Sequence, residues 1–281
     1  MIKFGPAGAS NSFQEDGFKH TIDIPLWLKG KQLDCFEYSF GKGVRITSET
    51  AQNIGREFAK YNIEISAHAP YYINFANNDP QKAQNNIGYL LDTLKALDWF
   101  GGNRCVFHSG SPLKMTRKEA MDNAKINLNC ALQYIYDGGF DNKLIGVETM
   151  GKVNQLGSID EVVELCNLDK VFVPCIDFGH VNAREQGVLK CEDDYKKLID
   201  TLIEGVGYEK VQKMHVHFSK IEYSKGGEVR HLTFEDDTFG PNFEPLASVL
   251  KMYKLEPYII CESAGTQTED AIFMKNYYNN I

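Results

Sequence analysis

The sequence has fewer basic than acidic residues, no long apolar run and no paired cysteine motif. Its 281 residues carry a formal net charge of −8, which argues against non-specific binding of nucleic acid by a basic face. No apolar run is long enough to span a membrane. The N-terminus MIKFGPAGAS lacks the basic, apolar and small-residue regions of a signal peptide. We therefore expect a cytoplasmic protein that has no membrane partner.

The seven cysteines are an odd number, and none belongs to a CxxC pair. Several lie within apolar runs, where a thiol acts as a small hydrophobic group. Neither a disulfide framework nor a cysteine zinc site is expected. The chain also lacks internal repeats, low-complexity tracts and Pro/Gly/Ser linkers. We expect one domain over residues 1–281.

Short apolar, β-branched or aromatic runs recur along the chain and predict eight strands. The runs are IKFG at 2–5, CFEYSF at 35–40, IEISAH at 63–68, RCVFH at 104–108, LIGVE at 144–148, VFVPCID at 171–177, VQKMHVH at 211–217 and YIICE at 258–262. Segments with helical spacing separate most of them, and several begin with Ser, Thr or Pro. Alternating strands and helices predict an α/β fold, a single (β/α)₈ TIM barrel with its active site at the C-terminal strand ends.

Polar side chains stand at or near the ends of six different predicted strands. They are His68, His108, Glu148, Asp177, His215 and Glu262. Histidine and carboxylate are ligands of Zn²⁺ and Mn²⁺, and strand ends converge at one mouth of a barrel. Any one of them alone is more often a satisfied core residue or a solvated loop residue. The whole set favours a metal centre, since a metal compensates carboxylates that follow apolar strands.

Two pairs of candidate ligands leave their assignment open. IDFGH places Asp177 and His180 three residues apart, which suits one metal or two neighbouring metals. KMHVHFSK at 213–220 contains His215 and His217, whose side chains share one face of a strand. The ligand should be the histidine at the layer where the other strand ends converge. Spacing alone does not choose between them.

These motifs resemble the endonuclease IV family of apurinic/apyrimidinic endonucleases, which are zinc enzymes of the xylose-isomerase-like TIM-barrel superfamily. The resemblance covers essentially the whole chain. It rests on HAPYYIN at 68–74, FHSG at 107–110, GVETM at 146–150, IDFGHVNA at 176–183, KMHVHFSK at 213–220, VRH at 229–231, FGPNFEPL at 239–246 and ICES at 260–263. It implies a monomeric DNA-repair hydrolase of a divergent branch. Such an enzyme cuts double-stranded DNA 5′ to an abasic site by phosphodiester hydrolysis.

The resemblance also implies a role for each candidate ligand. Glu148 would bridge two metals and, with Glu262, would be catalytic. The first metal would be completed by His68 and His108, the second by Asp177, His215 and Glu262, and a third would be bound by His180 and His231. By the same resemblance, His215 is the ligand and His217 is a neighbour.

The third metal site departs from the family pattern. The family has an aspartate in a D-R-H step, whereas this sequence reads GEVRH and places Val229 there. Glu228 is adjacent, but in a regular extended segment it would face away from the side of Val229. We therefore expect two firmly bound Zn²⁺ ions, with Mn²⁺ as a substitute, and a third that is labile or is rescued by Glu228.

Contacts with DNA are expected from two loops, by the same resemblance. FGKGVR contributes Lys42 and Arg45, and HAPYYIN contributes Tyr71 and Tyr72. Arginine can hold a phosphate or fill a gap, and tyrosine can stack on a base or wedge into the duplex. The alternative for the tyrosines is an aromatic pair that only packs on itself.

Two other functions remain open. A sugar isomerase or epimerase of the same superfamily would need one metal, held by Glu148, Asp177, His215 and Glu262. Such a site has no evident use for His68, His108 and His231. A barrel that binds damaged DNA or a nucleotide without cutting is the third possibility.

Overall fold

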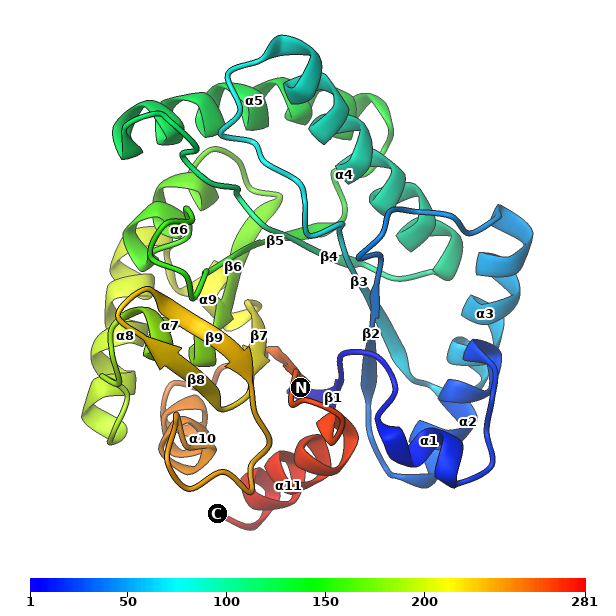
Figure 1. The fold of residues 1–281 in the computed structure, drawn as a ribbon. Helices are drawn as coiled ribbons and strands as arrows, with labels where there is room; N and C mark the ends of the chain where they lie inside the picture. The colour runs from blue at the N-terminus through cyan, green and yellow to red at the C-terminus, as the bar shows by residue number, and fades with distance from the viewer.

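Eight parallel strands form a barrel in the computed structural model, which describes residues 1–281 (Figure 1). The strands are β1 (Lys3–Pro6), β2 (Cys35–Ser39), β3 (Glu64–His68), β4 (Arg104–Phe107), β5 (Leu144–Glu148), β6 (Phe172–Asp177), β7 (His215–Phe218) and β10 (Tyr258–Cys261). Each overlaps one of the apolar runs of the sequence, and β1 and β7 extend one residue beyond theirs. The predicted (β/α)₈ TIM barrel is therefore confirmed.

The barrel closes between β1 and β2. An isolated parallel bridge joins Ala7 to Glu37, and the backbone N–H of Gly8 donates to the carbonyl oxygen of Glu37 over 3.0 Å. A Cβ atom at Gly5 would lie 1.7 Å from the carbonyl oxygen of Cys35. Only glycine allows the two backbones to approach so closely.

Helices surround the strands (Figure 1). The longer helices are α3 (Ser48–Tyr61), α4 (Pro80–Phe100), α5 (Arg117–Asp137), α6 (Ile159–Cys166), α8 (Glu192–Val206), α10 (Phe243–Met252) and α11 (Gln267–Asn280). The shorter ones are α1 (Asn11–Glu15), η1 (Thr21–Asp23), α2 (Ile24–Gly30), α7 (Phe178–Arg184) and α9 (Tyr208–Gln212). None of the helices combines the length and the apolar character that a membrane crossing requires.

Side-chain caps set the starts of several helices. The Thr47 and Asp79 side chains accept backbone N–H bonds at the first turns of α3 and α4. Thr116 with Glu119 and Ser158 with Glu161 form capping boxes at α5 and α6. These residues satisfy N–H groups that have no partner inside the helix, which is why the helices begin there.

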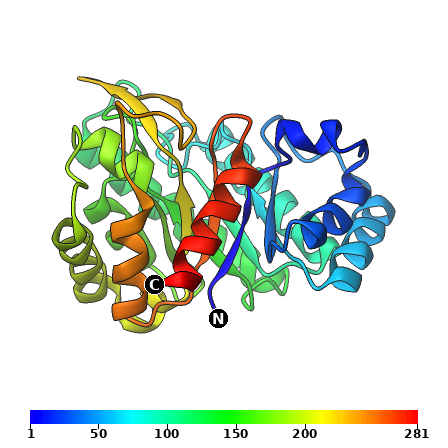
Figure 2. The ribbon, with the colours of Figure 1, turned by 90° about the horizontal axis from the view of Figure 1, so that it is seen from below.

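A two-stranded antiparallel hairpin, β8 (Ile221–Ser224) and β9 (Gly227–His231), was not expected from the sequence. It lies at the end of the barrel opposite the two chain termini (Figure 2). The Gly151 carbonyl accepts from the Glu228 N–H over 3.1 Å, and Lys152 forms a bridge with Gly227. The loop after β5 therefore fixes the hairpin beside the C-terminal strand ends.

Candidate metal centre

A pocket of about 320 Å³ opens at the C-terminal ends of the strands. Its lining includes His68, His108, Glu148, His180, Glu228, His231 and Glu262. Six of the eight predicted ligands therefore share one pocket. Asp177 is fully buried and lies within 4.8 Å of Glu148 and Glu262, measured between their potential ligand atoms.

Glu148 lies at the centre of this group. Its Oε2 atom is 2.9 Å from His68 Nε2 and 3.1 Å from His108 Nε2. Its Oε1 atom is 3.2 Å from His217 Nδ1 and 3.4 Å from His180 Nδ1. Each carboxylate oxygen thus faces a different pair of imidazoles, which is the arrangement that a carboxylate shared between two metal sites requires.

The surroundings of Glu148 keep it ionised. Burial would raise the pKa of its carboxyl group, but the charges of His108 and His217 and hydrogen bonds from His108 and His180 outweigh burial. The pKa of Glu148 therefore lies well below its ordinary value. An ionised carboxylate with 1% exposure is suited to binding a cation.

Two overlapping sets of potential ligands share Glu148 and His217: one adds His68, and the other adds Asp177 and Glu262. Asp177 caps α7, because its Oδ1 atom accepts from the backbone N–H of His180 over 2.7 Å. Its Oδ2 atom is buried and makes no hydrogen bond, although it lies 3.3 Å from His180 Nδ1. A buried carboxylate oxygen without a hydrogen bond is costly, and a cation at this point would satisfy it.

The structure places His217, and not His215, at this layer, which differs from the arrangement that the motif resemblance implied. Strand register gives the reason: β6 and β7 pair Asp177 with His217, whereas His215 pairs with Cys175 deeper in the barrel. His215 Nε2 lies 3.0 Å from Glu37 Oε2 instead.

The third set of potential ligands is His180, Glu228 and His231. His180 Nε2 lies 3.4 Å from Glu228 Oε2. Glu228 can reach the pocket because the ladder between β8 and β9 contains a bulge, which leaves Val229 without a partner residue and 50% exposed. The sequence suggested that Glu228 could contribute only if the register of this segment were shifted. The structure contains such a shift.

Outer hydrogen bonds orient three of the imidazoles. The Nδ1 atoms of His68, His180 and His231 lie 2.8, 2.9 and 2.8 Å from Ala69 O, Thr149 O and Ser219 Oγ. Because a carbonyl oxygen only accepts, Nδ1 of His68 and of His180 is the donor. Their Nε2 atoms face the carboxylates of Glu148 and Glu228, and these are the nitrogens that would bind a cation.

Two of the histidines are strongly basic as the structure stands. Burial lowers the pKa of His68, but hydrogen bonding to Glu148 and its charge raise it to about 9. Burial also lowers the pKa of His180, but Asp177 and Glu148 raise it to about 10. Protons on these rings compensate the buried carboxylates, and bound cations would take over that role.

A second, larger cleft of about 880 Å³ lies beside the metal pocket. Lys42 and Arg45 line it, and it shares Ser39 and Gly41 with the metal pocket. The expected basic residues therefore stand next to the candidate centre.

The two predicted tyrosines, Tyr71 and Tyr72, also lie close to the metal pocket. Tyr71 lines the metal pocket and is 66% exposed, and its ring centroid is 5.6 Å from that of Tyr72. Tyr72 also packs against Tyr89 at 5.1 Å. Lys152, on the loop after β5, lines the metal pocket too and was missed because nothing in its sequence neighbourhood marks it.

The family profile described as "Xylose isomerase-like TIM barrel" matches residues 29–277. The chain belongs to this family. An uncharacterized protein of Methanocaldococcus jannaschii is 35% identical over 277 residues, which cover 99% of this chain and 97% of that protein.

Relatives named as endonucleases confirm the resemblance seen in the motifs. Apurinic-apyrimidinic endonuclease 1 of Schizosaccharomyces pombe is 32% identical over 178 residues, 61% of this chain and 49% of that protein. A probable endonuclease 4 of Mycoplasma genitalium is 31% identical over 165 residues, 56% of this chain and 52% of that protein. The matches span about half the length of these two relatives. Identities near 30% fit a divergent branch.

Solved structures with this fold include proteins named as epimerases and proteins named as endonucleases. A D-tagatose 3-epimerase-like protein superposes with a TM-score of 0.71 at 17% identity, covering 99% of this chain and 96% of its own. Endonuclease IV from Thermus thermophilus superposes with a TM-score of 0.66 at 17% identity, covering 99% and 100%. At these identities the likeness shows the shared barrel fold.

Proposed function

We propose that this chain is a metal-dependent endonuclease that hydrolyses double-stranded DNA 5′ to abasic sites. The observation that carries the proposal is the clustering of three adjoining histidine and carboxylate sets around Glu148, with each oxygen of that residue facing a different pair of imidazoles. The relatives named as endonucleases support the same reaction class.

The histidines and carboxylates of these sets suit Zn²⁺, because imidazole nitrogen and carboxylate oxygen are common ligands of this ion. His68, His108 and Glu148 would hold one cation. Glu148, Asp177, His217 and Glu262 would hold a second, and His180, Glu228 and His231 a third. Bound divalent cations would supply Lewis acidity toward the phosphate oxygens.

The protein side chains would bind and orient the substrate. Lys152 lines the pocket and can neutralise a phosphate that enters it. Lys42 and Arg45, in the adjoining cleft, can hold the DNA backbone on the side of β2. Tyr71 is exposed at the mouth, where it can stack beside the lesion. This local set of basic residues would offset the net charge of −8 at the place where DNA binds.

A one-metal sugar epimerase is the second candidate. One observation favours it: Glu148, Asp177, His217 and Glu262 alone form a set with three carboxylates and one histidine. Two opposed carboxylates could move a proton beside a carbonyl group. His68, His108, His180 and His231 have no task in such a site, which is why we favour the nuclease.

The two functions separate in one pair of assays on zinc-loaded protein. A duplex with a single abasic site and a labelled 5′ end should be cut to a product whose 3′-hydroxyl a DNA polymerase can extend. An intact duplex of the same sequence is the control. Glu262→Gln should lose the incision, and Glu256→Gln, at the other end of β10, should keep it. Epimerisation of a ketose by the wild type without any incision would instead establish the second candidate.

A further inference from the structure

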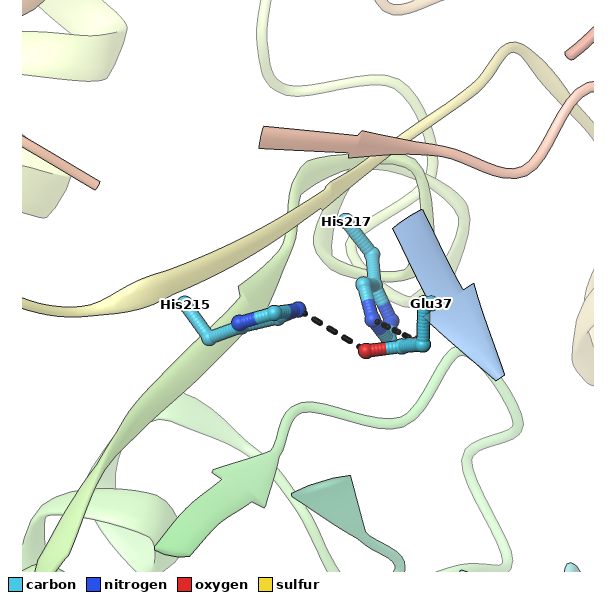
Figure 3. A group of neighbouring side chains, drawn as sticks. All are labelled: Glu37, His215 and His217. Atoms are coloured by element: carbon cyan, nitrogen blue, oxygen red, sulfur yellow. Dashed lines mark ion pairs between the residues drawn. The ribbon is translucent and has the colours of Figure 1, made fainter. Parts of the chain in front are cut away.

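A separate cluster of potential ligands lies deeper in the barrel. Glu37 on β2 and both His215 and His217 on β7 point toward one another across the barrel interior (Figure 3). All three are at most 1% exposed. Neither Glu37 nor His215 belongs to the three sets around Glu148.

The contacts in this cluster are ion pairs at short distance whose angles do not suit hydrogen bonds. Glu37 Oε2 is 3.0 Å from His215 Nε2, and Glu37 Oε1 is 2.9 Å from His217 Nε2. Nevertheless Glu37 Oε1 and both Nε2 atoms lack a hydrogen-bond partner. The ring nitrogens therefore face the carboxylate without directing an N–H at it.

Ligand atoms that bind one metal ion lie at similar distances from one another without being hydrogen bonded. Two ligand atoms, each about 2.1 Å from a metal, are about 3.0 Å apart at right angles and about 3.4 Å apart at the tetrahedral angle, and their lone pairs point at the metal and not at each other. Asp177 Oδ2, which faces the upper centre, is likewise buried and makes no hydrogen bond. Glu37 Oε1 and the Nε2 atoms of His215 and His217 thus resemble an expected metal ligand, because they too are buried and make no hydrogen bond.

The Glu37 carboxylate accepts few hydrogen bonds for a buried charge. Glu37 receives one hydrogen bond, from Ser66 Oγ to Oε2 over 3.1 Å. The other close contacts of the Glu37 carboxylate are with the two imidazoles, and His217 also lies beside Glu148.

We propose that Glu37, His215 and His217 bind an additional divalent transition-metal ion, such as Zn²⁺, inside the barrel one layer beneath the candidate centre. His217 would offer Nε2 to this ion, while its Nδ1 atom faces Glu148 and Glu262 above. When both levels are filled, the ring gives up its remaining N–H proton to solvent and bridges the two ions. The site does not depend on the nuclease function.

Wild-type protein loaded with Zn²⁺ provides the first test. Anomalous diffraction at the zinc edge should show a peak between Glu37 and His215, in addition to those near Glu148. Filled upper sites without this deeper peak would overturn the proposal and leave Glu37 as a residue that only positions His217. Because this measurement needs no variant, a folding defect cannot obscure it.

Variants then count the ions. By elemental analysis after dialysis, Glu37→Gln and His215→Ala should each retain one equivalent of zinc less than wild type. Ser66→Ala, which removes only the hydrogen bond to Glu37, should retain the wild-type number. Glu262→Gln should lose zinc above and keep the deeper peak, whether or not the protein cuts DNA. Equal zinc content in Glu37→Gln and wild type would refute the site, provided that circular dichroism shows both folded.

Discussion

Glu228 and His231 face the same pocket, although their spacing of three residues would place them on opposite sides of a regular strand. The bulge in the β8–β9 ladder makes this possible. Glu228 pairs with Tyr223 and Arg230 pairs with Glu222, so Val229 is the extra residue. The alternation of faces restarts after Val229, and the glutamate takes the place expected of an aspartate.

Glu228 should therefore be required for the third cation. We expect Glu228→Gln to retain one equivalent less of zinc than wild type after dialysis, because His180 and His231 alone give too few ligands. Val229→Asp should retain the wild-type number, since position 229 is 50% exposed on the bulge. Metal content measured by elemental analysis decides both. A gain of zinc in Val229→Asp would mean that the bulge is absent in solution.

Gly151 should matter because it lies against the same glutamate. A Cβ atom at Gly151 would come 2.6 Å from Glu228 Cβ and 2.9 Å from His180 Cδ2. Gly151→Ala should therefore destabilise the fold by about 1–3 kcal/mol and weaken the third cation. Urea unfolding and zinc titration measure the two effects. Gly88→Ala in α4 is the matched control, since its Cβ meets nothing within 4 Å and helix propensity favours alanine.

Glu262 should be indispensable for incision. Glu262→Gln removes a carboxylate from the set with Asp177 and His217 and leaves positive charge uncompensated when cations are bound. We expect a loss of at least about two orders of magnitude in kcat on abasic DNA. The variant should keep the wild-type circular dichroism spectrum. Near-normal incision would contradict the assignment of this carboxylate to the centre.

The strands were predictable because each is a short apolar run, and β6 and β10 are buried at every position. The ligands at strand ends followed, since register in a barrel brings last residues to one rim. The layer of His217 was not foreseen, because the motif was aligned by its first histidine, whereas the layer is set by pairing with Asp177. Such pairing is a long-range relationship that local sequence does not carry.

The contribution of Glu228 depended on a bulge, and the position of Glu37 depended on barrel closure. A bulge changes the face of the strand on which the following side chains lie, and no turn residue in the sequence indicates it. Glu37 lies within the apolar run CFEYSF, so its carboxylate was hidden by its neighbours. It meets His215 and His217 only because β2 and β7 line the same narrow interior. Neither contact could be inferred from spacing.

Tyr72 should contribute to DNA binding more than to bond cleavage. Its ring packs on Tyr71 and Tyr89, and it lies on the loop that follows His68. Tyr72→Ala should raise KM for abasic duplex several-fold with a smaller effect on kcat, the pattern of lost uniform binding. Tyr134→Ala, an exposed tyrosine on α5, is the control. A fall in kcat with unchanged KM would remove Tyr72 from the DNA interface.

Arg117 and Glu161 should stabilise the loop that carries Lys152. Arg117 Nη2 donates to Glu161 Oε2 over 2.7 Å, and the same guanidinium donates to the carbonyls of Val153 and Gln155. Glu161 also accepts the Gly157 N–H over 2.7 Å. Glu161→Gln should lower the free energy of unfolding at pH 7 by about 1.5–3 kcal/mol, the value of hydrogen bonds to a charged group. Urea unfolding measures it.

The same carboxylate should make part of this stability depend on pH. Burial would raise the pKa of Glu161, but the hydrogen bond from Arg117 and those from Ser158 and Gly157 outweigh it and lower the pKa from its ordinary value of 4.5. A lowered folded-state pKa means that the contribution is complete above pH 4.5 and is lost as pH falls through the folded-state value. The difference in unfolding free energy between wild type and Glu161→Gln should therefore be constant from pH 8 to about 5.5 and shrink below about 4.5. Glu164→Gln, on the next turn of α6 and paired with Lys125 at the surface, should differ little from wild type throughout. A difference that grows on acidification would show that Glu161 is held in its protonated form.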